Sequence, residues 1–191
     1  METKIDKSKT ALVVIDLQKG ITAMPAQPHD AKTVISNAAQ LAEAFRKNGM
    51  PVFLVRVAPA ADGKDALHPL VDGANPWGNA PRPADWTELV PEMAPQTGDF
   101  VVTKKQWGAF YGTDLDLQLR RRQIDTIVLC GIATNIGVES TARFAYEYGY
   151  QQIFAEDACA SMSAEAHNNS VSVIFPRIGK VRATADILAA L

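Results

Sequence analysis

Apolar residues occur along this chain in two patterns, and the first is a set of short continuous runs. These runs fall at 10–16, 52–57, 100–103, 125–131, 152–155 and 180–183. A strand that is buried on both faces has this composition, as in a parallel sheet that is covered by helices. The runs therefore predict six strands of a mostly parallel sheet.

The second pattern is a spacing of three and four residues between apolar positions, which predicts helices between the strands. Its clearest example spans the apolar positions of 34–45 and stops at Asn48 and Gly49, a glycine suited to a left-handed helix end. Further helices are expected at about 135–148 and 163–174, with a short helix at the C-terminus.

Another helix is expected after residue 113, although the pattern there is ambiguous. Thr113-Asp-Leu-Asp116 has the form of a capping box, and the basic run 120–122 would end the helix with favourable charges. Leucines at the alternate positions 115, 117 and 119 would also suit a strand. The cap and the terminal arginines favour the helix.

Strand and helix alternate along the chain, which predicts an α/β layered fold. The length of 191 residues, the hydrophobic fraction of 47% and the lack of repeats or linkers predict one domain, 1–191. The segment 58–98 carries seven of the eleven prolines and no strong periodicity. A loop this long is expected to be a lid, a binding loop or an oligomer contact.

Charge and composition exclude several classes of function. The formal net charge is −2, whereas a nucleic-acid binder normally carries a basic excess. No apolar stretch approaches the roughly 18 residues of a membrane span, and the first residues lack the apolar core of a signal peptide. The two cysteines, Cys130 and Cys159, fit buried thiols in a reducing compartment. We therefore expect a cytoplasmic protein without a nucleic-acid or membrane partner.

Candidate chemistry lies where predicted strands end. Asp16 closes the first strand, Lys104 follows the third, and the turn 131–137 follows the fourth. Ligands of open parallel sheets bind beyond these carboxyl ends. A buried acid costs free energy unless it is paired, and Lys104 is the candidate partner of Asp16. The alternative is that Asp16 caps a turn and Lys104 is a solvated surface charge.

Nucleotide and metal motifs are missing from the sequence. The chain contains neither GxGxxG nor GxxxxGK[ST], so a nucleotide site is unsupported. The three histidines, His29, His68 and His167, have no metal-ligand spacing and fit surface or packing positions. No cofactor and no metal site is expected.

Four segments, in this order and spacing, resemble the isochorismatase-like hydrolases, a superfamily that also holds nicotinamidases and N-carbamoyl amidohydrolases. They are Ala11-Leu-Val-Val-Ile-Asp-Leu-Gln18, Lys104-Lys-Gln-Trp-Gly-Ala-Phe-Tyr-Gly-Thr-Asp-Leu115, Val128-Leu-Cys-Gly-Ile-Ala-Thr-Asn-Ile-Gly-Val138 and Ala155-Glu-Asp-Ala158. The resemblance runs over nearly the whole chain and is greatest to a bacterial branch of uncharacterised hydrolase-like proteins. It implies a Rossmann-like three-layer sandwich with a six-stranded, mostly parallel sheet.

The resemblance also implies a catalytic site with one departure. The family triad is Asp, Lys and Cys; Asp16 and Lys104 match the first two, and Gly137 stands at the cysteine position. In the amidase members the thiol is the nucleophile, so their usual reaction is not expected here. Cys130 lies inside a predicted strand and is not a substitute. The metal-binding amidases carry an Asp-x-His element after strand two, which residues 57–70 do not contain.

Isochorismatases also carry glycine at this position and cleave a vinyl ether, with the aspartate as general acid. Burial would favour this role for Asp16 by raising its pKa, whereas the Lys104 cation would lower it. Isochorismatases follow strand two with Thr-Ala-Gln-Pro, whose glutamine holds the substrate, but this chain reads Val55-Arg-Val-Ala58. We therefore expect hydrolysis of a small molecule other than isochorismate. The alternative is a non-catalytic ligand-binding or scaffolding oligomer that retains the fold.

The family further implies a non-proline cis peptide at Ile132-Ala133. That turn would aim the amides of Ala133 and Gly137 into the cleft as a cradle for an oxyanion or a carboxylate. The alternative is an ordinary turn with Asn135 as N-cap.

Three further expectations concern the surroundings of the cleft. Trp107 and Tyr111 are candidates to line the pocket beside Lys104. The family commonly assembles as dimers to octamers, so a homo-oligomer is expected. The segment 58–98 would then supply the contact between subunits.

Overall fold

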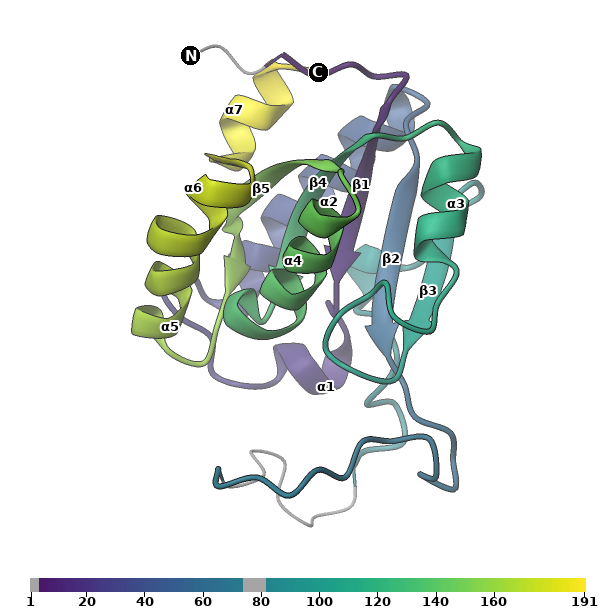
Figure 1. The fold of residues 1–191 in the computed structure, drawn as a ribbon, viewed down its shortest axis with the longest axis vertical. Coiled ribbons are helices and arrows are strands. Elements are labelled where there is room, and N and C mark those ends of the chain that lie inside the picture. Colours follow the sequence, from purple (N-terminus) through teal and green to yellow (C-terminus); the bar gives the residue numbers. More distant parts are fainter. Residues whose placement is uncertain (1–3, 74–81) are drawn as a thin grey trace.

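The computed structural model describes residues 4–73 and 82–191. Six strands form one sheet in the order β3-β2-β1-β4-β5-β6, and each neighbouring pair is parallel (Figure 1). The strands are β1 (Thr10–Ile15), β2 (Val52–Val57), β3 (Phe100–Lys104), β4 (Thr126–Ile132), β5 (Gln151–Ala160) and β6 (Lys180–Arg182). The predicted α/β fold with six strands is confirmed, and its sheet is wholly parallel.

Helices cover both faces of this sheet. Figure 1 shows α2 behind the sheet and α3 and α4 in front of it. The helices are α1 (Lys19–Thr22), α2 (Ala31–Lys47), α3 (Leu115–Arg121), α4 (Glu139–Glu147), α5 (Ala164–Asn169), α6 (Phe175–Ile178) and α7 (Thr184–Ala189), with a 3-10 turn η1 (Pro91–Met93) and two π-helical turns, η2 (Thr134–Val138) and η3 (Ser170–Ile174). In the described part of the chain no helix is long and apolar enough to cross a membrane.

Burial in the core explains why the strands have continuous apolar sequences. Every residue of β1 is buried, because the strand has neighbours on both edges and helices on both faces. The long helix α2 begins at Asp30, whose carboxylate accepts a hydrogen bond from the Thr33 amide at 2.7 Å. It ends at Asn48, and Gly49 follows with a φ of 68°. This helix therefore has the C-terminal end that the sequence predicts.

Two expected helix starts differ from the prediction. The predicted helix after residue 113 forms, but the capping box is wrong because Asp116 accepts bonds from Tyr150 Oη and Arg120 instead of reaching back to Thr113. The helix expected at about 135–148 begins one residue earlier, as the π-helical turn η2. Asn135 is not its N-cap, since the Asn135 side chain accepts a hydrogen bond from Ser161 at 2.5 Å.

The Pro-rich segment has two different halves. Beyond β2 the chain extends away from the body of the molecule (Figure 1), and residues 74–81 lie outside the described part. The returning half packs on the core, where Trp86, Val90 and Met93 are buried. Gln18 fastens it by donating hydrogen bonds to the carbonyls of Val57 and Trp86. The expectation that this segment forms a subunit contact stays a prediction.

Strand order reverses between β1 and β4, and Gly131 of β4 lies against Ile15 of β1 at this point. Gly131 pairs with Ile15 and has a φ of 126°. A Cβ atom on Gly131 would overlap the Ile15 carbonyl oxygen and would lie 2.7 Å from the Ile15 nitrogen. Only glycine fits this position, because both the backbone conformation and the space exclude a side chain. Open parallel sheets bind ligands where strand order reverses. In this protein that point includes the close contact between the backbones of Gly131 and Ile15.

We expect Gly131→Ala to lower the free energy of unfolding by at least about 3 kcal/mol, because it adds steric overlap to an unfavourable φ. Gly98→Ala is the matched control: its φ is 96°, but nothing lies within 4 Å of the added Cβ. That control should cost only about 1–2 kcal/mol. Urea unfolding of both variants measures the difference, and equal losses would refute the close-approach argument.

Candidate active site

Asp16 lies immediately beyond β1, at the point where strand order reverses. Its φ is 53°, a left-handed conformation that is uncommon outside glycine. The Asp16 amide donates to the Val55 carbonyl at 2.9 Å, and the Asp16 carbonyl accepts from the Gln18 amide at 2.8 Å. These backbone bonds hold a residue that is only 5% exposed at the mouth of the sheet.

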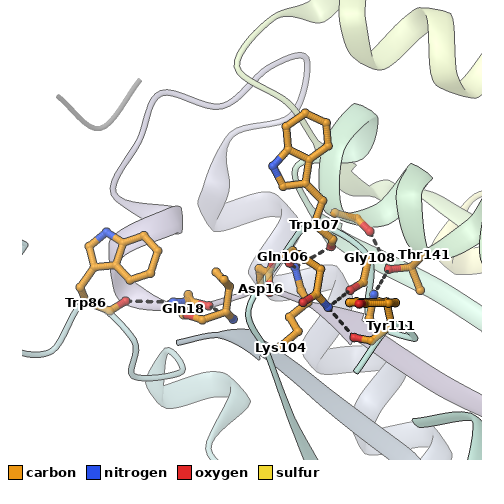
Figure 2. Close-up of polar contacts among 12 residues, drawn as sticks. Asp16, Gln18, Trp86, Lys104, Gln106, Trp107, Gly108, Tyr111 and Thr141 are labelled. Carbon is orange, nitrogen blue, oxygen red and sulfur yellow. Dashed lines mark hydrogen bonds and ion pairs between the residues drawn. The ribbon is translucent and has the colours of Figure 1, made fainter. Parts of the chain in front are cut away.

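Lys104 ends β3 and reaches Asp16 from the far side of β2. Its Nζ donates hydrogen bonds to Asp16 Oδ2 at 2.7 Å, to the Trp107 carbonyl at 2.7 Å and to the Gln106 carbonyl at 3.1 Å (Figure 2). The three ammonium hydrogens therefore all have acceptors. Lys104 is 1% exposed, so the interpretation of Lys104 as a solvated surface charge is wrong.

The electrostatics of Asp16 reflect two opposing influences. Burial raises the pKa of Asp16 from its usual 3.8 to about 6, and the nearby Lys104 cation offsets only part of this rise. The two carboxylate oxygens differ, because Oδ2 accepts from Lys104 while Oδ1 is buried without a hydrogen-bond partner. A proton on this carboxyl group belongs on Oδ1, since Lys104 already donates to Oδ2.

Gly137 faces this ion pair from the turn after β4. A Cβ atom at Gly137 would lie 3.1 Å from Asp16 Oδ2 and 3.5 Å from Lys104 Nζ. It would also lie 2.9 Å from Ile15 Cγ2, which is closer than real Cβ contacts. A side chain at residue 137 would thus point at both charged groups. The structure brings together the three positions that the family motifs predict, and the third carries no side chain.

The turn that carries Gly137 is shaped by the bonds around Ala133. The Ile132-Ala133 peptide is cis, as the family resemblance implies. The Ala133 carbonyl accepts from the amides of Ile136 and Val138, which closes the π-helical turn η2. The Gly137 carbonyl accepts from the Thr141 hydroxyl at 2.6 Å. That hydroxyl also accepts from the Ala109 amide at 3.1 Å, so the turn is joined to the segment after β3.

The segment after β3 is held by its backbone. Gln106 donates hydrogen bonds to the carbonyls of Gly108 and Tyr111 (Figure 2). Trp107 contributes its carbonyl to Lys104, whereas the side chains of Trp107 and Tyr111 are exposed. Gln106 and Thr141 are positioning residues that sequence reasoning missed. Gln106 is part of the lysine motif, but Thr141 has no local signal because its link to the Ala109 amide joins residues that are distant in the sequence.

Neither cysteine takes the place of a nucleophile at residue 137. Cys130 and Cys159 are free and buried. Burial raises the pKa of Cys159 to about 12 and that of Cys130 well above its usual value. Both thiols are therefore protonated at neutral pH, and a protonated thiol is a poor nucleophile.

Comparison with known proteins agrees with the fold and the motifs. The isochorismatase domain model matches residues 10–186. An uncharacterised isochorismatase family protein of Bacillus subtilis is 56% identical over 184 residues, 96% of this chain and 95% of that one. Another, from Escherichia coli O157:H7, is 53% identical over 188 residues, 98% of this chain and 99% of that one.

A solved structure gives the same answer. That of an isochorismatase family protein from Burkholderia thailandensis has a TM-score of 0.93 and 44% identity, covering 100% of this chain and 99% of that one. The fold and the buried aspartate–lysine pair thus define a hydrolase of the isochorismatase-like class. The chain belongs to the isochorismatase family.

Breaking the buried ion pair should have a cost that grows with pH. In Lys104→Met the pKa of Asp16 rises further, so the folded state takes up a proton that the unfolded state, with a pKa near 3.9, releases. Proton uptake by the folded state makes stability fall as pH rises. We expect a loss of about 3–5 kcal/mol at pH 8 and a smaller loss at pH 5.

Denaturant unfolding at both pH values measures this loss. Lys105→Met is the neighbouring control, because Lys105 pairs with the half-exposed Asp65. A loss in Lys104→Met that does not change with pH, or one equal to that of Lys105→Met, would contradict the buried pair's role.

Proposed function

We propose that this protein hydrolyses a small molecule without a cysteine nucleophile, by general acid/base catalysis at Asp16. A vinyl ether or a related bond is the substrate class that this chemistry suits. Asp16 and Lys104 are the proposed catalytic residues, and Gly137 is the proposed place where the reacting atoms approach them. Trp107, Tyr111 and the amide of Ala133 are proposed substrate contacts.

One observation carries this proposal: the direction in which Gly137 faces Asp16 and Lys104. A Cβ atom at Gly137 would lie 3.1 Å from Asp16 Oδ2 and 3.5 Å from Lys104 Nζ, so residue 137 places no side chain against either charged group. A covalent intermediate at residue 137 is excluded, because glycine offers no nucleophile. What stays in the site is an acid–base group with a pKa of about 6, which can exchange a proton near neutral pH.

The chemistry that follows is a proton transfer and a water attack. Protonated Asp16 delivers the Oδ1 proton to the terminal carbon of the vinyl ether, which forms a C–H bond and leaves an oxocarbenium ion. Water adds to the cationic carbon and returns one proton to Asp16. The resulting hemiketal then breaks its C–O bond to release a carbonyl compound and an alcohol. Lys104 would hold Oδ2 and keep the transferable proton on Oδ1.

A second candidate is a ligand-binding or scaffolding oligomer without turnover. The near-complete burial of both charged groups favours it, since a substrate must reach a carboxyl group whose side chain is 7% exposed. Retention of both charges favours the enzyme, because a pair kept only for stability is commonly replaceable by apolar residues.

A turnover screen separates the two candidates. Purified protein is offered isochorismate, other enol ethers and a panel of amides and carbamoyl compounds. We expect turnover of an enol ether that falls at least about 100-fold in Asp16→Asn, because that variant cannot transfer the proton. Asp99→Asn is the matched control, a buried carboxylate that pairs with Arg46 elsewhere. No turnover of any compound would favour the scaffold, and equal rates in the two variants would exclude Asp16 as the catalytic acid.

The pH dependence then assigns the role of Asp16. A general acid must be protonated in the free enzyme, so kcat/KM should fall about tenfold per pH unit above about pH 6. A general base would give the opposite limb, with kcat/KM falling below that pH. A pH–rate profile from pH 4.5 to 8.5 measures the limb. A flat profile across this range would exclude Asp16 from the proton transfer.

A further inference from the structure

A second group of polar side chains converges beside β5, outside the aspartate–lysine pair. The pairing of β4 with β5 is irregular: Leu129 pairs with Phe154, and Gly131 with Cys159. A single residue of β4 therefore faces the four residues 155–158 of β5. Bulges of this kind redirect side chains and are common next to functional sites. Glu156 lies within this bulge.

Two of the three histidines meet the carboxylate of Glu156. His29, in the segment before α2, places Nε2 at 3.5 Å from Glu156 Oε2. His167, in α5, places its Nε2 at 4.0 Å from the same oxygen. The two imidazole rings meet edge to face, with centroids 5.7 Å apart and planes at 82°. One ligand atom from each of the three residues lies within 4.8 Å of the other two.

A hydrogen bond with Thr134 fixes the orientation of the His167 ring. Its Nδ1 is 2.8 Å from the Thr134 hydroxyl oxygen, and the residue is 2% exposed. When Nδ1–H donates to this hydroxyl, the lone pair of Nε2 points toward Glu156. Metal-bound histidines are commonly oriented by such a hydrogen bond on the other ring nitrogen.

The chemistry of the three side chains suits a shared metal ion. Imidazole nitrogens and a carboxylate oxygen are the donor set that divalent zinc and its neighbours in the first transition row bind. Here two imidazole rings and one carboxylate direct such atoms toward a common point.

We propose that His29, Glu156 and His167 form a binding site for a divalent first-row transition metal ion of the zinc type. A tetrahedral ion with bonds of about 2.0–2.1 Å needs ligand atoms about 3.4 Å apart. The observed separations of 3.5 Å, 4.0 Å and at most 4.8 Å require only a small inward shift. The side chains of His29 and Glu156, 28% and 34% exposed, can make that shift and leave a fourth position open to water.

A bound metal ion would link segments that are distant in the sequence. The three ligands come from the segment before α2, from β5 and from α5, which are far apart in the sequence. Thr134, which orients His167, belongs to the same π-helical turn as Gly137. A bound ion would therefore join three segments and brace the turn beside the ion pair from the opposite side.

The test is metal binding by the full chain after removal of metal with a chelator and dialysis. Zn²⁺ is titrated calorimetrically, and Co²⁺ is added as a probe whose visible absorption reports its coordination. We expect one Zn²⁺ per chain and a rise in the midpoint of thermal unfolding. Glu156→Gln and His29→Gln should each weaken Zn²⁺ binding at least about tenfold. Both sites of change are partly exposed, so the variants should fold.

Two matched controls address binding elsewhere. His68→Gln removes the third histidine, which is exposed, and Glu165→Gln removes a carboxylate near His167 in the sequence that is outside the cluster. Neither should change the affinity for Zn²⁺. Absence of binding to the wild-type chain overturns the proposal, as does unchanged affinity in Glu156→Gln and His29→Gln. A loss in His68→Gln equal to that in His29→Gln also overturns it, because it would show surface binding only.

Discussion

The buried ion pair of Asp16 and Lys104 at the carboxyl edge of the sheet is the interaction on which the surrounding structure depends. Lys104 satisfies its three hydrogens with Asp16 and with the carbonyls of Gln106 and Trp107. The segment after β3 must therefore fold back over the lysine. Gln106 stabilises this fold by donating hydrogen bonds to the carbonyls of Gly108 and Tyr111. Removing water from both ions is costly, and the network of acceptors offsets that cost. The conformation of the site thus follows from the requirement that the buried Lys104 ammonium group have three oxygen acceptors.

The placement of this pair depends on strand order. Asp16 follows β1 and Lys104 ends β3, so the two residues are separated by the width of β2. An aspartate side chain is short, and a lysine has four methylene groups, which suits the lysine to the more distant strand. The glycine turn after β4 approaches from the other side of β1, where Gly131 allows contact with the Ile15 backbone. Three strand ends therefore supply one site.

Local patterns predicted the strands because a strand buried on both faces leaves a continuous apolar run. They also indicated Asp16, Lys104 and the glycine turn, since each follows such a run directly. Patterns failed where the deciding contact is distant in the sequence. Asp116 takes Tyr150 as its partner in place of a local cap, and His167 of α5 meets His29 of the segment before α2. Spacing of histidines along the chain carries no information about such a meeting.

The narrow space around Gly137 has a consequence for how this family could change its chemistry. A cysteine there would have its Cβ 2.9 Å from Ile15 Cγ2, and Ile15 is wholly buried in the core. Trimming Ile15 to alanine would make room but would cost about 2–5 kcal/mol. Acquisition of a thiol in this chain therefore requires that Ile15 shift or be replaced by a smaller residue. The side chains that residues 15 and 137 of this chain can carry are thus coupled.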